Sequence, residues 1–178
     1  GELKYATVSS IAVAGSVASV NGQTGAVVAY FPPQGRITLT SGVPVLISTV
    51  SAATTVYYTP YVGNMTPIYD GTNLTPTALA ELSIALGGSW TTNSNWDVFI
   101  ASDAGTIRAC TGPAWASSSA RGTGAGTTEL TRTVGLLMNA NSMTCRYNNS
   151  TTFTVAANRG TYVGSFRTGA AGQTIFIL

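Results

Sequence analysis

Histidine is absent from the 178 residues of the sequence. Its absence excludes serine–histidine and cysteine–histidine nucleophilic catalysis, and it removes the most common protein ligand of zinc, copper and iron. Charge is also scarce, since charged residues make up 8% of the chain, against roughly 25% in an ordinary soluble domain. The net charge is +2 and no run of Lys or Arg occurs. The basic footprint of a nucleic-acid-binding protein is therefore missing, and we expect no nucleic-acid partner.

Long apolar runs and cysteines are few as well. Ser, Thr, Asn or Gly interrupts every apolar stretch before the roughly 20 residues that cross a bilayer, so we expect no insertion into a membrane. Cys110 and Cys145 lie far apart in the sequence without another soft ligand, which argues against a structural zinc site. The two could form a disulfide, but a single pair without a secretory context is more typical of two buried thiols. We predict no metal and no cofactor.

The residues that replace the missing charge favour β-structure. Hydrophobic residues make up 44% of the chain, which also contains 20 glycines and many Thr, Ser and Asn residues. Such residues suit strands and turns, whereas solvated helix faces rely on Glu, Lys and Gln. The sequence therefore predicts an all-β fold, either an antiparallel sandwich or a jelly-roll or barrel-like domain.

Alternating polar and apolar residues, punctuated by turn residues, predict a series of short strands. Asp70-Gly71 and Asp103-Ala104-Gly105 are the expected hairpin turns. A helical turn is predicted at 77–80, because Thr75-Pro76 matches a helix cap followed by proline at the first helical position. The predicted strands lie at residues 36–40, 43–50, 54–59, 82–86, 95–100, 106–110, 129–134, 136–138, 142–147, 151–155, 161–166 and 174–178, and residues 111–128 are predicted to form a loop.

The N-terminal residues differ in composition from the rest of the chain. Residues 1–31 are rich in small side chains, and Pro32-Pro33-Gln34-Gly35 follows them as a boundary, since proline fixes the backbone and glycine allows an abrupt turn. A segment with so few bulky side chains buries little area by itself. We predict an extended N-terminal arm at 1–31 that serves for attachment, followed by a β-sandwich domain at 32–178.

Carboxylates offer the main alternative to a structural protein. A glycosidase needs two of them facing a sugar, and Asp97, beside Trp96, could act with Asp103 or Glu129. The competing interpretation places Asp97 on the outward face of a strand and Asp103 in a turn. We favour that second interpretation and predict no catalytic residue and no enzyme. The glycine-rich residues 122–128 lack the lysine of a phosphate-binding loop and are expected to form a loop at the end of a sheet.

Aromatic residues suggest both a core and a contact surface. Trp96, Phe99 and Phe166 lie in strand patterns and are predicted to be buried. Tyr57, Tyr58 and Tyr61 stand close together, so they point to both faces of a strand and at least one should be exposed. Exposed tyrosines stack on sugar rings or anchor subunit interfaces. We predict these three tyrosines as interface or glycan contacts, and favour the interface.

Several blocks of the sequence, in this order, resemble a pattern that recurs in bacteriophage and prophage virion proteins. They include PPQGRITLTSGVPV at 32–45, TVYYTPYVGN at 55–64, PIYDGT at 67–72, WDVF at 96–99, TGPAW at 111–115, RGTGAGTTEL at 121–130 and NRGTYVGS at 158–165. Together they span most of residues 32–168. The segment SVNGQTG at 19–25 is similar to one that is common in phage fibre proteins.

The resemblance implies a fibre, spike or decoration protein on the head or tail of a phage particle. Such proteins are generally trimeric and often bind host-surface glycans. We therefore expect a non-enzymatic structural protein at the virion surface, forming a homotrimer and contacting other capsid or tail proteins. The alternatives are a carbohydrate-binding module that recognises a host receptor and, with less support, a tailspike that degrades polysaccharide.

Overall fold

The computed structural model describes residues 31–176, and the predicted arm at 1–31 lies almost wholly outside them. The described chain contains no helix and is 51% strand, which confirms the predicted all-β class with antiparallel pairing. The strands are β1 (Gly35–Thr38), β2 (Val50–Ala53), β3 (Thr55–Pro60), β4 (Met65–Tyr69), β5 (Leu74–Ala78), β6 (Leu82–Ala85), β7 (Asn95–Asp103), β8 (Thr106–Ala114), β9 (Leu130–Thr133), β10 (Leu136–Asn139), β11 (Met143–Arg146), β12 (Thr152–Val155), β13 (Thr161–Ala170) and β14 (Gln173–Phe176).

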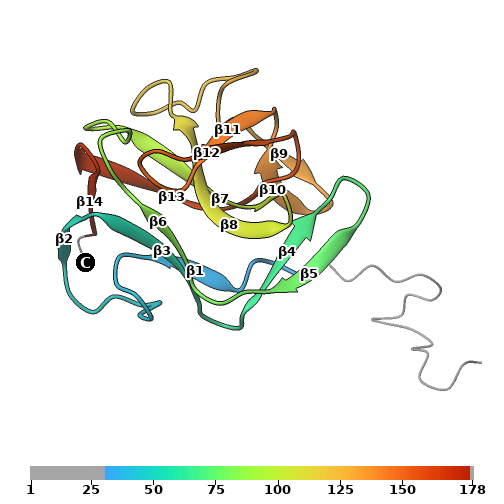
Figure 1. Cartoon of the computed structure of the whole chain (residues 1–178), viewed down its shortest axis with the longest axis horizontal. Helices are drawn as coiled ribbons and strands as arrows, with labels where there is room; N and C mark the ends of the chain where they lie inside the picture. The colour runs from blue at the N-terminus through green and yellow to red at the C-terminus, as the bar shows by residue number, and fades with distance from the viewer. Residues whose placement is uncertain (1–30, 177–178) are drawn as a thin grey trace, which may run out of the picture. The chain divides into compact units, whose positions relative to one another are not determined.

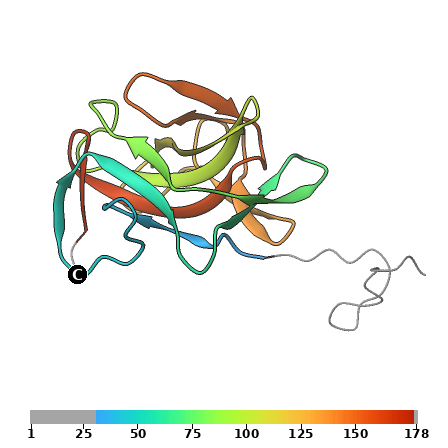
Figure 2. The same ribbon diagram turned by 60° about the horizontal axis from the view of Figure 1, so that its bottom comes forward.

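The strands form one large sheet and two small ones. The large sheet has the order β12-β11-β8-β7-β13-β10-β9, with β14 attached to β13 and β2 attached to β14. The small sheets are β1-β3-β6 and the hairpin β4-β5. In Figure 1, β1 and β3 lie on one side of β7, β8 and β13, and β9 to β12 lie on the other side. Figure 2 shows the same layers with the lower side turned forward. The strands β7, β8 and β13 therefore form a central layer that is covered on both faces.

A first hydrophobic core lies between this central layer and the small sheets. Alternate residues of β7 point into it, namely Trp96, Val98 and Ile100, and all three are buried. They pack against Val56 and Ile84 of the β1-β3-β6 sheet, as expected for alternating strands that each offer one apolar face. Burial of this apolar surface is the main force that holds the two layers together.

A second core occupies the other face of β7 and β8. It contains Phe99 and Ala101 of β7, and it is completed by Met143 and Val155 of the outer strands. Residues of both parities along β7 are thus buried, in keeping with a strand that has structure on both sides. The hairpin turn between β7 and β8 lies at Ala104-Gly105, as predicted, and both residues have the positive φ angles of a tight turn.

Three local predictions are wrong. The predicted loop at 111–128 begins too early, because β8 continues to Ala114. The predicted helical turn at 77–80 overlaps β5, where Pro76 lies opposite Pro67 in a two-stranded sheet. Proline donates no hydrogen bond, so this pair fits only at a position where neither nitrogen faces the other strand. The predicted strand at 43–50 is mostly a loop. Thr38 Oγ1 donates to the Val43 carbonyl and the Gly42 N–H donates to Glu81, which holds the chain in a turn. Pro44 has no N–H to donate to a neighbouring strand.

Candidate functional site

Asp97 is fully buried, so its predicted position on the outward face of a strand is wrong. The prediction failed because β7 is covered on both faces, and the segment after β8 lies over the face that carries Asp97. Four hydrogen bonds reach the carboxylate. Arg121 Nε and Thr128 Oγ1 donate to Oδ2 at 2.7 and 2.8 Å, and Arg121 Nη2 and Ser165 Oγ donate to Oδ1 at 3.2 and 2.5 Å.

The hydrogen bonds to Asp97 hold the glycine-rich loop, residues 122–128, against the central layer. Arg121 and Thr128 lie at the two ends of that loop, so one buried side chain holds both ends. The guanidinium of Arg121 also stacks over Trp115 at 4.3 Å and lies 5.6 Å from the ring centre of Tyr162. Partial burial opposes the charge of Arg121, but the hydrogen bonds and the charge of Asp97 outweigh it and raise the pKa of Arg121.

The other carboxylates proposed as catalytic partners have separate structural roles. Asp103 accepts a hydrogen bond from Arg108 Nε at 2.8 Å, beside the β7–β8 turn. Glu129 accepts one from the backbone N–H of Gly124 at 2.8 Å and one from Asn141 at 2.9 Å. Each of the three acids therefore has its own set of donors. Within residues 31–176, no group of three Cys, Asp or Glu side chains is arranged to hold a metal ion.

The three predicted contact tyrosines lie in different environments. Tyr58 is buried, so it cannot contact a partner at the surface; its hydroxyl accepts from the Gly35 N–H at 3.0 Å and lies 2.9 Å from Thr66 Oγ1. Burial is also the main cause that raises the pKa of Tyr58. Tyr57 is half-buried. Tyr61 is 51% exposed, and the guanidinium of Arg36 lies 4.9 Å from the centre of its ring.

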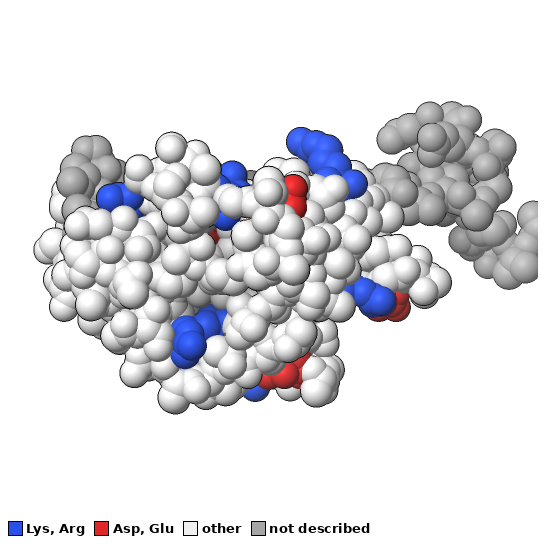
Figure 3. All heavy atoms as spheres, turned by 90° about the horizontal axis from the view of Figure 1, so that it is seen from above, with Lys and Arg blue, Asp and Glu red and all other residues white. Residues whose placement is uncertain are grey.

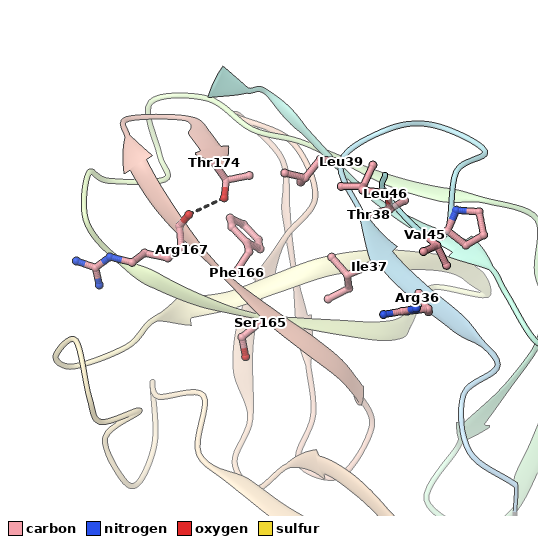
Figure 4. Close-up of a pocket in the computed structure, with 11 residues that line it drawn as sticks. Arg36, Ile37, Thr38, Leu39, Val45, Leu46, Ser165, Phe166, Arg167 and Thr174 are labelled. Atoms are coloured by element: carbon pink, nitrogen blue, oxygen red, sulfur yellow. Dashed lines mark hydrogen bonds between the residues drawn. The ribbon is translucent and has the colours of Figure 1, made fainter. Parts of the chain in front are cut away.

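A groove opens at the side of the sandwich, between β1 with its following loop and β13 with β14. It has a volume of about 400 Å³, and we call it the edge groove. Figure 4 shows Ile37, Leu39 and Phe166 pointing toward one another across it, while the side chain of Arg167 points away. The groove is lined by Arg36, Ile37, Thr38, Leu39, Pro44, Val45, Leu46, Ser165, Phe166, Arg167 and Thr174.

The loop that forms one wall of the edge groove, residues 39–49, is anchored by Glu81. The carboxylate of Glu81 accepts hydrogen bonds from Ser41 Oγ and Thr59 Oγ1 at 2.5 Å each, and from the Gly42 N–H at 2.6 Å. Burial alone would raise the pKa of Glu81, but these three hydrogen bonds outweigh it and lower the pKa below its ordinary value of 4.5.

The pKa of Glu81 gives an expected pH dependence. Because the folded pKa is lower than the unfolded one, the carboxylate stabilises the fold above pH 4.5, and this contribution is lost as the pH falls through the folded pKa. We expect Glu81→Gln to lower the free energy of unfolding by about 1 kcal/mol at pH 7, and by much less at pH 3. Urea denaturation of both proteins at the two pH values measures the difference. A difference that stays constant between pH 7 and pH 3 would contradict the assignment.

Four large apolar side chains are exposed, on two loops that flank β1. Val45 and Ile47 belong to the 39–49 loop and are 46% and 89% exposed, and Tyr61 and Val62, at 51% and 73%, follow β3. The Tyr61 and Val62 N–H groups both donate to the carbonyl of Gln34, which directly precedes β1. Figure 3 shows one face of the molecule, on which the few charged side chains lie scattered among uncharged ones.

The chain was compared with known proteins in three ways. No family model, no curated protein and no solved structure matches it. The proposed function therefore rests on the described residues and on the sequence patterns alone.

Sequence reasoning missed the residues that organise these sites. Arg121, Thr128 and Glu81 gave no signal, because single polar residues in loop-like segments are normally solvated. Trp90 was also missed. It is buried in the first core, and its Nε1 donates to Thr111 Oγ1 at 3.0 Å. One signal was available. Asp97 lies within the mainly apolar run of β7, and a carboxylate buried there needs a charged or hydrogen-bonding partner elsewhere in the chain.

Proposed function

We propose that the chain is a non-enzymatic structural protein at the surface of a bacteriophage particle, as a fibre, spike or decoration protein. In this proposal it forms a homotrimer, and residues 1–31 attach it to capsid or tail proteins. The observation that carries the proposal is the group of exposed apolar side chains at Val45, Ile47, Tyr61 and Val62 on a body with few charges. Large apolar side chains exposed on a surface with few charges are typical of regions that become buried between subunits.

The geometry of Asp97 supports a non-enzymatic role. A carboxylate offers about four lone-pair sites, and hydrogen bonds from Arg121, Thr128 and Ser165 take up four on Asp97. Its relative exposure is 0%. An acid or base for glycoside hydrolysis must reach the glycosidic oxygen or a water beside it. Asp97 therefore fits a role in stability better than one in catalysis.

Localisation on intact particles tests the proposal directly. Antibodies raised against residues 31–176 are applied to phage particles released from the cells that carry the gene, and bound antibody is located by gold labelling and electron microscopy. We expect regular labelling of the head or tail surface, and co-purification of the chain with particles through a density gradient. A chain that remains entirely in the particle-free fraction would overturn the proposal.

A carbohydrate-binding module is the second candidate, favoured by the half-exposed ring of Tyr61 beside Arg36. An aromatic face next to a guanidinium matches the stacking and hydrogen bonding that sugars require. If this candidate is correct, Tyr61→Ala should reduce binding to a glycan array at least tenfold, a loss of about 1.4 kcal/mol. Val62→Ala, at the adjacent exposed position, is the matched control. A blank array with the unchanged protein would remove this candidate and leave the structural proposal intact.

A further inference from the structure

The edge groove has an apolar floor. Ile37, Leu39 and Phe166 line the groove and also pack against the first core, so its floor is the outer surface of that core. Pro44, Val45 and Leu46 add an apolar wall. Its volume of about 400 Å³ lies within the range of small-molecule sites, roughly 300–1,000 Å³. A ligand seated in the groove would shield this apolar surface from water.

The hydroxyl groups that line the groove already have partners within the protein. Thr38 Oγ1 and Thr174 Oγ1 each donate to a backbone carbonyl, at 2.6 and 2.5 Å. Ser165 Oγ donates to Asp97 Oδ1 at 2.5 Å. A hydroxyl has one proton to donate, so these three groups have none left for a ligand. A ligand covered with hydroxyls, which needs many donors around it, is therefore poorly matched to the groove.

Arginine supplies the charge at the groove. Arg36 and Arg167 line it, and no described acidic residue does. Arg167 Nη1 donates to Asn95 Oδ1 at 3.1 Å, and its side chain points away from the groove in Figure 4. The guanidinium of Arg36 lies 4.9 Å from the ring centre of Tyr61, and within residues 31–176 it forms no ion pair. A guanidinium that stacks on a ring keeps the N–H groups at its edge for other acceptors, so Arg36 can receive an anion.

We propose that the edge groove binds a single-chain aliphatic carboxylate, that is, a medium-chain fatty acid. The carboxylate pairs with the guanidinium of Arg36, whose parallel N–H donors match the two oxygens. The alkyl chain lies over Ile37, Leu39 and Phe166, which point toward one another across the groove, and it displaces water from them. Because the groove is near the small end of the range for ligand sites, we assign one alkyl chain to it rather than the two chains of a membrane lipid.

This binding activity goes beyond the proposed structural function and does not depend on it. Of the four exposed apolar side chains assigned to self-association, Val45 lines the groove, whereas Ile47, Tyr61 and Val62 do not. Most of the surface assigned to subunit contacts therefore lies outside the ligand site. A chain that assembles without binding fatty acid would overturn this inference alone, and a monomer that binds fatty acid would contradict self-assembly alone.

Equilibrium dialysis of the 178-residue chain against radiolabelled octanoate tests the proposal. We expect saturable binding of one octanoate per chain. Unlabelled hexanoate should compete about tenfold more weakly, because two fewer CH₂ groups are buried. Octan-1-ol should also compete about tenfold more weakly, because it has no charge to pair with the guanidinium. The absence of saturable binding, or binding to phosphatidylglycerol vesicles but not to octanoate, would overturn the proposal.

A substitution of the arginine separates the charged contact from the apolar one. Arg36→Gln should weaken octanoate binding about tenfold and leave octan-1-ol binding unchanged. Arg132→Gln is the matched control, because Arg132 is an exposed arginine of β9 that does not line the groove. Both arginines are exposed, so neither variant should change the melting temperature. An equal loss of octanoate binding in the two variants would show a general effect of charge and would overturn the site.

A second pair of variants tests the apolar wall. Val45→Ser should weaken octanoate and octan-1-ol alike, by about fourfold, since both lose contact with one methyl group. Ile47→Ser is the matched control, because Ile47 belongs to the same loop, is 89% exposed and does not line the groove. It should bind both ligands as the unchanged protein does. Unchanged binding in Val45→Ser, or an equal loss in Ile47→Ser, would place the ligand outside the edge groove.

Discussion

Asp97→Asn is expected to lower the free energy of unfolding by about 3 kcal/mol. The substitution places a neutral amide against Arg121, Thr128 and Ser165, all of which donate to the carboxylate. The amide nitrogen cannot accept a hydrogen bond, so at least one buried donor loses its partner and the guanidinium loses its counter-charge. We place the loss at the low end for a broken buried ion pair, because the side chain of Arg121 is 30% exposed.

Asp103→Asn is the matched control for this prediction. Asp103 also pairs with an arginine, but the side chains of Arg108 and Asp103 are 33% and 27% exposed, against 0% for Asp97. Water screens such a pair, and we expect a loss within about 1 kcal/mol. Urea denaturation of both variants measures the two values under the same conditions. Equal losses would contradict the role of Asp97 as the buried anchor of the glycine-rich loop.

Reduction of the Cys110–Cys145 disulfide is expected to destabilise the fold by about 3–4 kcal/mol, according to the chain-entropy estimate for a closed loop of this length. The structure joins the two cysteines across β8 and β11, with a Cα–Cα distance of 5.6 Å and a separation of 35 residues. Both side chains are buried in the second core. The sequence analysis favoured two buried thiols. Both cysteines are buried, but the structure joins them in a disulfide.

The disulfide prediction is checked by urea denaturation with and without a thiol reductant. The unchanged protein should unfold at a clearly lower urea concentration when reductant is present. The double variant Cys110→Ala, Cys145→Ala is the control, and its midpoint should not respond to reductant. A midpoint of the unchanged protein that is insensitive to reductant would mean that the bond contributes nothing to stability.

The sequence predicted the class of the fold and most of its strands, because strand formation depends on local alternation. β3 and β6 follow from that pattern, and the turn at Ala104-Gly105 follows from its turn residues. β7 was also predicted, although it is a mainly apolar run rather than an alternating one. Strand β5 was missed because Thr75-Pro76 resembles the start of a helix. That signal covers only a few residues, and pairing with β4 overrides it. The predicted strand at 43–50 failed because the anchoring of its loop depends on Glu81, about 40 positions away.

The candidate site was less predictable than the fold. The sequence predicted that at least one of Tyr57, Tyr58 and Tyr61 is exposed, and Tyr61 is 51% exposed. The burial of Tyr58 and Asp97 depends on which layers cover β3 and β7, which is a matter of tertiary structure. The edge groove is likewise invisible in the sequence, because it forms between strands of two different sheets and depends on how those sheets pack.

The mass of the 178-residue chain in solution tests the central claim most directly. The claim is that this β-body works by associating with its own copies through exposed apolar surface. Sedimentation equilibrium over a range of micromolar concentrations gives that mass. The proposed trimer predicts a species of three times the 18.2 kDa chain mass, and Val62→Glu should shift it toward the monomer. A single species of one chain mass at every concentration would contradict the account.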